Sequence, residues 1–175
     1  MPLDPDCRLC ALWHGRRGVV PPSGDPRSKV ALVGEGPGEK EDLLGQPFVG
    51  RAGRALDRLM QEVGLERDKV LITNTVKCRP PGNRRPTSDE VRACRPYLEE
   101  ELQGKEFVLA LGLSAAEGLL GRKVKLKEEA NREFEVLMGG GPVKVMVTYH
   151  PSACVYRPQA REVLREALRA ARAYL

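Results

Sequence analysis

Short apolar segments rich in β-branched residues alternate along the chain with longer segments in which apolar residues recur every three or four positions. The short segments are bounded by turn-forming residues and predict β-strands, which are Lys29–Val33, Lys69–Thr73, Phe107–Leu111 and Val143–Tyr149. The longer segments carry an apolar stripe and predict amphipathic helices, which are Arg51–Val63, Val91–Leu102, Ser114–Leu120 and Gln159–Leu175.

Strands that alternate with helices predict an α/β fold, here a three-layer sandwich with a four-stranded parallel sheet between helices. Two capping boxes mark helix starts, Thr87 with Glu90 and Ser114 with Glu117, because their hydroxyl and carboxylate groups satisfy free amides. The segment Arg122–Gly141 fits neither period, and we expect an irregular connection there with a hairpin strand. Since ligands of such sheets bind beyond the carboxyl ends of the strands, we expect one cleft at these ends.

The composition is that of an ordinary folded protein and limits the kinds of partner that we expect. With 175 residues, of which 41% are hydrophobic and 30% charged, we expect one domain over residues 1–175. No apolar run approaches the roughly 20 residues of a bilayer span, and the N-terminus lacks the residue order of a signal peptide. We therefore expect a cytoplasmic protein with no membrane partner. The net charge of +5 and the arginines in loops, such as Arg51, Arg84 and Arg157, favour a polyanionic partner.

Four of the five cysteines are candidate metal ligands. Cys7 and Cys10 form a CxxC motif, and Cys78 and Cys94 bracket a segment rich in proline and arginine. In a reducing compartment such cysteines indicate metal binding before disulfides. The second CxxC knuckle of a zinc ribbon is missing, and the wide, uneven spacing favours a [4Fe–4S] cluster over structural zinc, although both take four thiolates. We expect the fifth, Cys154, to be a free thiol.

The ends of the predicted strands carry the candidate binding groups. The turn Gly34–Gly38 has Glu39 where a dinucleotide-binding fingerprint needs its third glycine, so it favours close approach to a neutral ring or a merely tight turn. Asn74 either caps a turn or binds a pyrimidine edge, since its amide offers an acceptor and two donors that distinguish uracil from cytosine. His150 precedes a proline at the last strand end, which favours function over a structural role.

The loop before the first long helix holds further candidates. Phe48 lies in a polar, glycine-rich loop, where it either packs in the core or stacks on a base. Gly50 and Gly53 open a helix whose free amides, together with Arg51, can hold a DNA phosphate. Ser114 lacks the glycine pattern of a nucleophile elbow and is interpreted as a helix cap.

Together these segments resemble the uracil-DNA glycosylases, specifically the iron–sulfur family 4 enzymes of thermophiles. The resemblance covers most of the chain and is carried by Val33–Gly38, Glu41–Asp42, Gly45–Gly53, Thr73–Arg84 and His150–Ser152, with Cys7, Cys10 and Cys94. It implies a monomer that acts on uracil in single- or double-stranded DNA, hydrolyses the N-glycosidic bond and leaves an abasic site. It also implies one [4Fe–4S] cluster on Cys7, Cys10, Cys78 and Cys94.

The resemblance assigns a role to each candidate residue. The implied catalytic residues are His150, Glu35 and Asn83. The implied substrate-binding residues are Gly34, Gly36, Glu41, Phe48 and Asn74. The implied DNA-binding residues are Arg51, Gly53, Arg84, Ser152 and Arg157. In this scheme Phe48 stacks on the extruded base, Asn74 binds its edge, and His150 hydrogen-bonds the oxygen on which charge accumulates as uracil departs.

Departures from the family pattern leave alternatives open. Gly36 stands where the classical branch has an Asp, so Glu35 or Asn83 must orient the water, or the reaction needs little such help. Asn83–Thr87 lacks the His of a related branch that crosslinks to DNA, which argues against that activity. Gly38 offers little bulk to reject a C5 methyl, so a glycosylase that also accepts hypoxanthine or mismatched thymine is one alternative. A non-catalytic iron–sulfur module that binds damaged DNA and a zinc-stapled nucleic-acid protein are the others.

Overall fold

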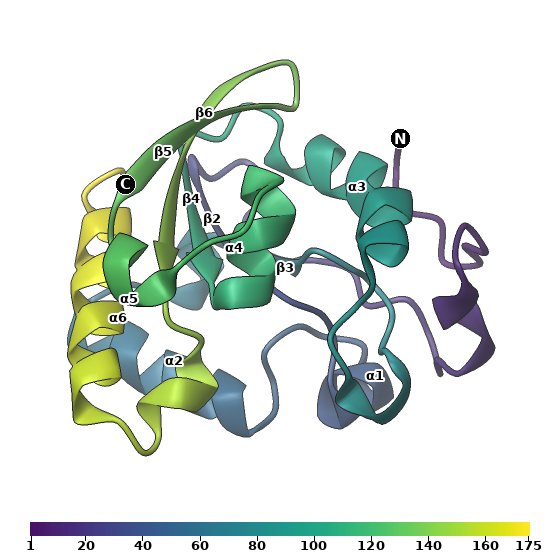
Figure 1. The fold of residues 1–175 in the computed structure, drawn as a ribbon, viewed down its shortest axis with the longest axis horizontal. Helices are drawn as coiled ribbons and strands as arrows, with labels where there is room; N and C mark the ends of the chain where they lie inside the picture. Colours follow the sequence, from purple (N-terminus) through teal and green to yellow (C-terminus); the bar gives the residue numbers. More distant parts are fainter.

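The computed structural model describes residues 1–175 and has a six-stranded mixed sheet at its centre (Figure 1). In chain order the strands are β1 Ser23–Gly24, β2 Val30–Gly34, β3 Leu71–Asn74, β4 Phe107–Leu111, β5 Glu133–Met138 and β6 Gly141–Thr148. Their order across the sheet is β1-β3-β2-β4-β6-β5. The parallel strands β3, β2, β4 and β6 are the four that the sequence predicts, while the edge strands β1 and β5 pair antiparallel.

Helices cover both faces of the sheet, which confirms the predicted α/β sandwich. They are α1 Glu39–Leu44, α2 Arg51–Glu62, α3 Ser88–Leu102, α4 Leu113–Leu120, α5 Leu126–Glu129 and α6 Pro158–Arg172. Four 3-10 turns join them, η1 Ala11–His14, η2 Arg67–Lys69, η3 Pro81–Asn83 and η4 Pro151–Cys154. Helices α2 and α6 pack on one face, and α3 and α4 on the other (Figure 1). None of the helices is long and apolar enough to cross a bilayer.

Alternation within each strand explains why the strand segments are continuously apolar. In β4, Phe107, Leu109 and Leu111 face the core beneath α2 and α6, while Val108 and Ala110 face the core beneath α3 and α4. All five side chains are fully buried. A parallel strand with both faces covered therefore shows no polar alternation.

The two predicted capping boxes have different outcomes. At α3 the Thr87 hydroxyl accepts from the Glu90 amide at 3.2 Å, and the Glu90 carboxylate accepts from the Thr87 amide at 2.8 Å. The prediction that Ser114 caps α4 is wrong, because α4 begins at Leu113 and its N-cap is Gly112. The Glu117 carboxylate instead binds Arg85 and the amide of Val124.

The segment Arg122–Gly141 contains more regular structure than its sequence indicates. It holds the short helix α5, and then β5, which pairs with β6 as a hairpin. The expected hairpin strand is therefore present, while the irregular part is confined to the connections. Side chains of β5 alternate between exposed and half-buried positions up to the buried Met138, since only one face of this edge strand meets the core.

Candidate active site

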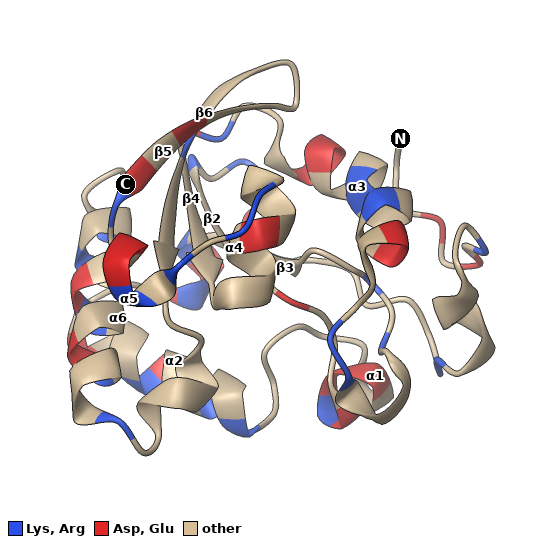
Figure 2. Ribbon diagram, viewed as in Figure 1, with Lys and Arg blue, Asp and Glu red and all other residues tan.

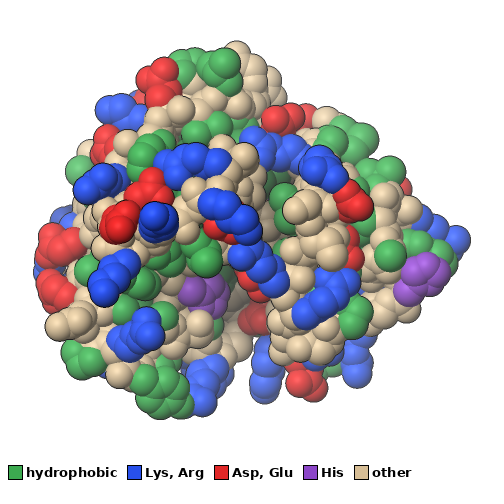
Figure 3. Space-filling view, viewed as in Figure 1, with side chains coloured by type: hydrophobic (Ala, Val, Ile, Leu, Met, Phe, Trp, Pro, Cys, Tyr) green, Lys and Arg blue, Asp and Glu red, His purple; other side chains and the backbone are tan.

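The carboxyl ends of β2, β3 and β6 open onto one cleft of about 360 Å³, as expected for this type of sheet. Most of the predicted site residues line it, namely Glu35, Gly36, Glu41, Phe48, Gly53, Asn74, Asn83, Arg84, His150 and Ser152. Gly34 lies just beneath Phe48 and Asn74, while the exposed Arg51 and Arg157 lie outside the cleft lining. Figure 3 shows a hollow in this face with Lys and Arg side chains around it.

Phe48 is held in a left-handed backbone conformation with φ +53° and is only 7% exposed. Such strain in a non-glycine residue persists only when its surroundings fix it. A Cβ at Gly34 would overlap the Phe48 ring and lie 2.6 Å from Asn74 Oδ1, and a Cβ at Gly53 would overlap the Phe48 carbonyl. These two glycines therefore seat the ring against the cleft. Gly53, predicted to contact DNA, is itself buried by this packing.

A residue that the sequence analysis missed also fixes this loop. The Arg67 guanidinium donates to the carbonyls of Phe48 at 2.8 Å and Pro47 at 2.9 Å, and pairs with Asp57 at 2.8 Å. Arg67 lies in η2, nineteen positions from Phe48. A single arginine in a short polar turn carries no periodic signal, so only the structure links it to the site.

Asn74 is the last residue of β3 and is only 4% exposed. Its backbone carbonyl accepts a hydrogen bond from Lys77. Its side-chain amide forms no hydrogen bond within the protein, and its polar atoms are open to the cleft that it lines. Because buried polar groups are normally hydrogen-bonded, this amide is a donor and acceptor kept for a ligand.

His150 lies at the opposite side of the cleft, with its ring 5.9 Å from the Phe48 ring. Its Nδ1 accepts from the Ser152 backbone amide at 3.1 Å and lies 2.8 Å from the Ser152 hydroxyl. Since a backbone amide only donates, Nδ1 must carry a lone pair, and the ring proton is on Nε2. Burial lowers the pKa of His150 to about 4, against the opposing charge of Glu41. The imidazole is therefore neutral near pH 7 and offers Nε2–H as a donor.

Glu41 joins two loops of the site. Its carboxylate accepts from the backbone amides of Gly38 at 3.0 Å, Val49 at 2.9 Å and Gly50 at 2.6 Å. The sequence assigned it to substrate binding. Its oxygens accept from these amides, so it fixes the first turn against the Phe48 loop and brings negative charge near His150. Glu41 also lines the cleft, and its role in substrate binding stays a prediction.

The two candidates for orienting a water molecule stand on different elements. Glu35 follows β2 and lines the cleft, and its side chain forms no hydrogen bond within the protein. Asn83 has a left-handed backbone with φ +59°, and its Oδ1 accepts from Arg79 Nε at 2.7 Å. At Gly36 a Cβ would lie 2.7 Å from Val76 Cγ2, so an aspartate there would require Val76 to move.

The arginine-rich loop before α3 is partly neutralised within the protein. Arg84 forms a bidentate pair with Glu90 at 2.8 and 2.9 Å, and Arg85 pairs with Glu117 at 2.5 Å. On the other side of the cleft, the Arg51 guanidinium donates to the hydroxyl of Tyr156, and Tyr156 is 77% exposed. Lys and Arg occupy the loop before α3 and the loop between α4 and α5 in Figure 2.

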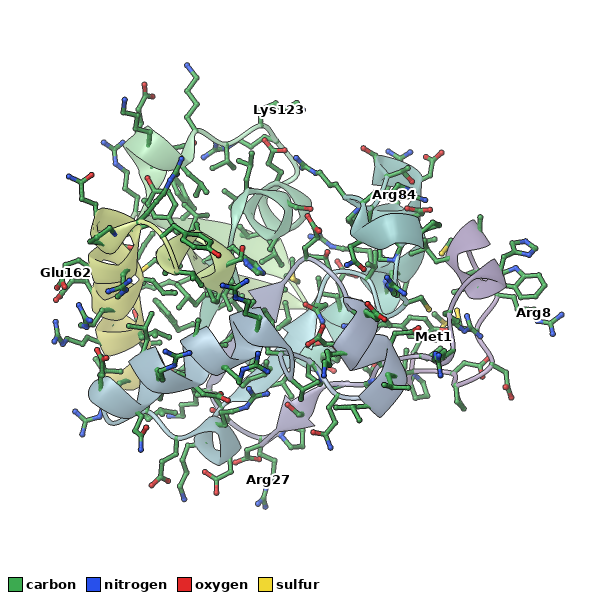
Figure 4. All side chains as sticks on the ribbon, turned by 90° about the horizontal axis from the view of Figure 1, so that it is seen from below. Met1, Arg8, Arg27, Arg84, Lys123 and Glu162 are labelled. Atoms are coloured by element: carbon green, nitrogen blue, oxygen red, sulfur yellow. The ribbon has the colours of Figure 1, made fainter.

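The four predicted metal ligands line a separate apolar pocket between the N-terminal segment, the loop after β3, and α3. Sulfur atoms gather where the N-terminal segment meets α3 in Figure 4. All four thiols are free, and burial raises the pKa of Cys94 to about 12. Arg16 donates to the Cys78 sulfur at 3.6 Å, and the Leu9 amide donates to the Cys7 sulfur at 3.5 Å. Cys154 is free and buried in η4, outside this pocket.

No three His, Cys, Asp or Glu side chains converge tightly enough to hold a single metal ion. The four thiols around one apolar pocket supply the thiolates that a [4Fe–4S] cluster and a structural zinc ion both take.

Comparison with known proteins agrees with this geometry. The sequence model of the Uracil DNA glycosylase superfamily matches residues 21–172. The chain is 40% identical over 171 residues to a type-4 uracil-DNA glycosylase of Saccharolobus solfataricus, covering 93% of this chain and 79% of the relative. It is 40% identical over 162 residues to a type-4 enzyme of Archaeoglobus fulgidus, covering 89% and 81%. It is 42% identical over 149 residues to one of Thermotoga maritima, covering 83% and 76%. The chain therefore belongs to the uracil DNA glycosylase superfamily and, within it, to the type-4 uracil-DNA glycosylases.

Proposed function

We propose that this protein excises uracil from DNA as a repair glycosylase, cleaving the bond between the base and its sugar and leaving an abasic site. The observation that carries the proposal is the side chain of Asn74, which is buried, open to the cleft and without a partner in the protein. The type-4 relatives named above, which are uracil-DNA glycosylases, support the same activity.

Recognition of the base follows from the groups around the cleft. The Phe48 ring offers a face for stacking, and Asn74 offers a carbonyl oxygen to the N3–H of uracil and an amide hydrogen to its O4. Cytosine presents the reverse pattern at these two positions. It would leave buried polar groups unpaired, which is the source of strong discrimination between similar ligands.

The chemical step requires stabilisation of the leaving base. Extrusion of the nucleotide costs a few kcal/mol, least for a mispaired base. As the N-glycosidic bond breaks, its electron pair moves onto uracil, and the neutral His150 donates Nε2–H to O2, where the charge accumulates. A water oxygen bonds to the sugar carbon and releases a proton, and the uracil anion leaves. Glu35 and Asn83 are the residues proposed to orient this water.

DNA is proposed to lie across the mouth of the cleft. The first helical bond of α2 runs from the Arg54 amide to the Gly50 carbonyl, so three preceding amides have no partner in the protein. These amides with Arg51, and the side chains of Arg84, Ser152 and Arg157, are proposed to hold phosphates around the extruded nucleotide. To bind a phosphate, Arg84 must give up its ion pair with Glu90. Its contribution to the affinity for DNA is therefore the difference between these two interactions.

We also propose that Cys7, Cys10, Cys78 and Cys94 hold a [4Fe–4S] cluster. Four free thiols around one apolar pocket and hydrogen-bond donors near two of the sulfurs support this group. When bound, the cluster would supply a covalent cross-link between the N-terminal segment, the loop after β3, and α3. The predicted single domain, monomeric state and cytoplasmic location stay predictions.

The proposal is tested with a labelled oligonucleotide that carries one uracil, incubated with the protein and then cleaved with hot alkali. We expect cleavage at uracil by the wild type, and at least about a hundredfold slower cleavage by Asn74→Ala and His150→Ala. Arg27→Met serves as the control and should retain activity, because the side chain of Arg27 is 92% exposed and does not line the cleft. Absence of cleavage by iron-loaded wild type that binds the DNA would overturn the proposal in favour of a damage-binding module.

Broader specificity is tested in the same assay. The turn Gly36–Gly38, with only Pro37 as a side chain, lines the cleft, so this wall has little bulk with which to exclude a substituted base. Oligonucleotides with hypoxanthine or mismatched thymine are the substrates to compare. Cleavage of these at rates near that of uracil would establish a broader glycosylase.

A further inference from the structure

Lys77 is among the most deeply buried side chains of the protein, with 1% of its side chain exposed. Its ammonium group donates to Thr73 Oγ1, to the Asn74 carbonyl and to Glu101 Oε1, each at 2.6 Å. Burial of an ammonium ion is strongly unfavourable unless it is paired and hydrogen-bonded. Three partners within 2.6 Å satisfy all of its donors, so the lysine belongs to a built polar network.

This network connects the site to α3. Lys77 follows Asn74 by three residues and directly precedes Cys78, and Glu101 stands near the end of α3. The Thr73 hydroxyl also donates to Glu101 Oε1 at 2.6 Å, which closes the network. The turn after β3 is therefore folded back on itself and tied to the helix that carries Cys94.

The hydrogen bond given for Asn74 is to its backbone carbonyl, so none within the protein fixes the orientation of its side chain, which lines the cleft. What remains to fix it is the steric contact with Gly34 and the position of its own backbone. The backbone is held on the carbonyl side by Lys77. Loss of the ammonium would free this carbonyl and leave the Glu101 carboxylate, which already has a buried and unpartnered Oε2, without its counter-charge.

We propose that the buried Lys77–Glu101 pair is a positioning device that fixes Asn74 for base recognition. The inference rests on the proposed function, since it assigns Lys77 to the step in which Asn74 binds the extruded base. It predicts that loss of Lys77 impairs the reaction of bound DNA, while affinity for DNA, which depends on phosphate contacts elsewhere, is kept.

The chain offers a matched control in Lys105, which is 5% exposed and donates to the Pro26 carbonyl at 2.8 Å. It precedes β4, at the end of the sheet opposite the cleft. Lys77→Met and Lys105→Met therefore each remove one buried ammonium. For Lys77→Met we expect kcat to fall at least about tenfold with KM for uracil-containing DNA within about twofold. For Lys105→Met, at a temperature where it is folded, we expect both constants to stay near those of the wild type.

A double-mutant cycle with Asn74→Ala separates positioning from stability. If Lys77 acts through Asn74, Lys77→Met should lower the single-turnover rate of wild type but should not lower that of Asn74→Ala further. Iron content and circular dichroism are measured for every variant. If Lys77→Met fails to fold or to hold iron, Glu101→Gln takes the place of Lys77→Met in the cycle. This variant keeps the Lys77 ammonium but weakens its interaction with residue 101.

Two results would overturn the proposal. In one, Lys77→Met lowers the single-turnover rate by the same factor in the wild-type and Asn74→Ala backgrounds, or Glu101→Gln does so where it is used in place of Lys77→Met. The other is an equal loss of kcat in Lys77→Met and Lys105→Met. Failure of the proposed function would look different, because the wild type itself would then release no uracil.

Discussion

Two side chains of the cleft, Asn74 and His150, show how individual residues are kept ready for a ligand. Asn74 is buried, and its side-chain amide lines the cleft without a hydrogen bond to the protein. His150 has one ring nitrogen occupied by Ser152 and the other left as a donor. Both were predicted from the sequence because each ends a strand of a parallel sheet, where ligands bind. The tautomer and charge of His150 could not be predicted, since both depend on its burial and on Ser152.

The low pKa of His150 predicts a specific dependence of stability on pH. In the unfolded chain the imidazole takes up a proton near its ordinary pKa of about 6.5, whereas in the folded protein it does so only near 4. Unfolding therefore binds a proton between these values, so stability is lost as the pH falls through this window. Between pH 7 and pH 5 we expect this group to lower the free energy of unfolding by about 2 kcal/mol.

Denaturant unfolding of wild type and His150→Gln at these two pH values measures this contribution. The carboxylates titrate equally in both proteins, so the difference between them isolates His150. A pH dependence of stability that is the same in the two proteins would contradict an imidazole that stays neutral in the folded protein.

The loop that carries Phe48 gives a second prediction at the scale of single residues. Arg67 holds the carbonyls of Pro47 and Phe48, so Arg67→Met should let the strained backbone of Phe48 relax and move its ring from the cleft. Because small misplacements at a reacting site are costly, we expect uracil excision to slow by roughly tenfold or more. Single-turnover kinetics measure this, with Arg27→Met as the control, since the side chain of Arg27 is 92% exposed. Equal rates in the two variants would contradict a role for Arg67 in seating Phe48.

Whole elements were predicted from the sequence where their length allowed a period to show. The parallel strands and the helices α2, α3, α4 and α6 each have a buried face long enough to be recognised. The elements β1, α1 and α5 have two, six and four residues and were missed, because so few positions contain no full repeat. Lys77 and Arg67 were missed for a related reason, since a lone basic residue in a loop resembles a solvated one.

The start of α3 and the start of α4 allow the correction of the capping prediction to be tested. Thr87 accepts from the Glu90 amide, whereas Ser114 lies inside α4 and no hydrogen bond of its hydroxyl is formed. Thr87→Ala should therefore lower the free energy of unfolding by about 1 kcal/mol, and Ser114→Ala should change it little. Urea unfolding of the two variants against wild type makes the comparison. A larger loss of unfolding free energy in Ser114→Ala than in Thr87→Ala would support the predicted capping box at the start of α4.

At the scale of the whole molecule, the protein consists of a sheet with two large cores and an N-terminal segment with a small core of its own. The two large cores bury the faces of the sheet, and the small core gathers Leu12, Val76, Tyr97 and the buried cysteines. The cleft and the cysteine pocket are joined by one short stretch of chain, from Asn74 to Cys78. Figure 1 shows the N-terminal segment beside α3, away from α6.

This arrangement predicts that the cysteine pocket can fail without loss of the sheet. Cys94→Ser removes one ligand from α3, so we expect loss of bound iron and release of the N-terminal segment, with faster protease cleavage before residue 20. The large cores contain none of Cys7, Cys10, Cys78 and Cys94, so the far-ultraviolet circular dichroism should change little. Cys154→Ala is the matched control and should retain iron, because Cys154 lies in the core beneath α2 and α6.

Hydrogen exchange distinguishes the two ways in which the variant can fail. If the cysteine site is only a cross-link, exchange in Cys94→Ser should rise in the N-terminal segment and in the loop after β3, while the amides of β2 and β4 stay protected. If exchange rises through the whole sheet, the metal instead stabilises the entire fold. In the first case uracil excision should fall in proportion to the disorder after β3, because Asn74 is the last residue of β3 before that loop.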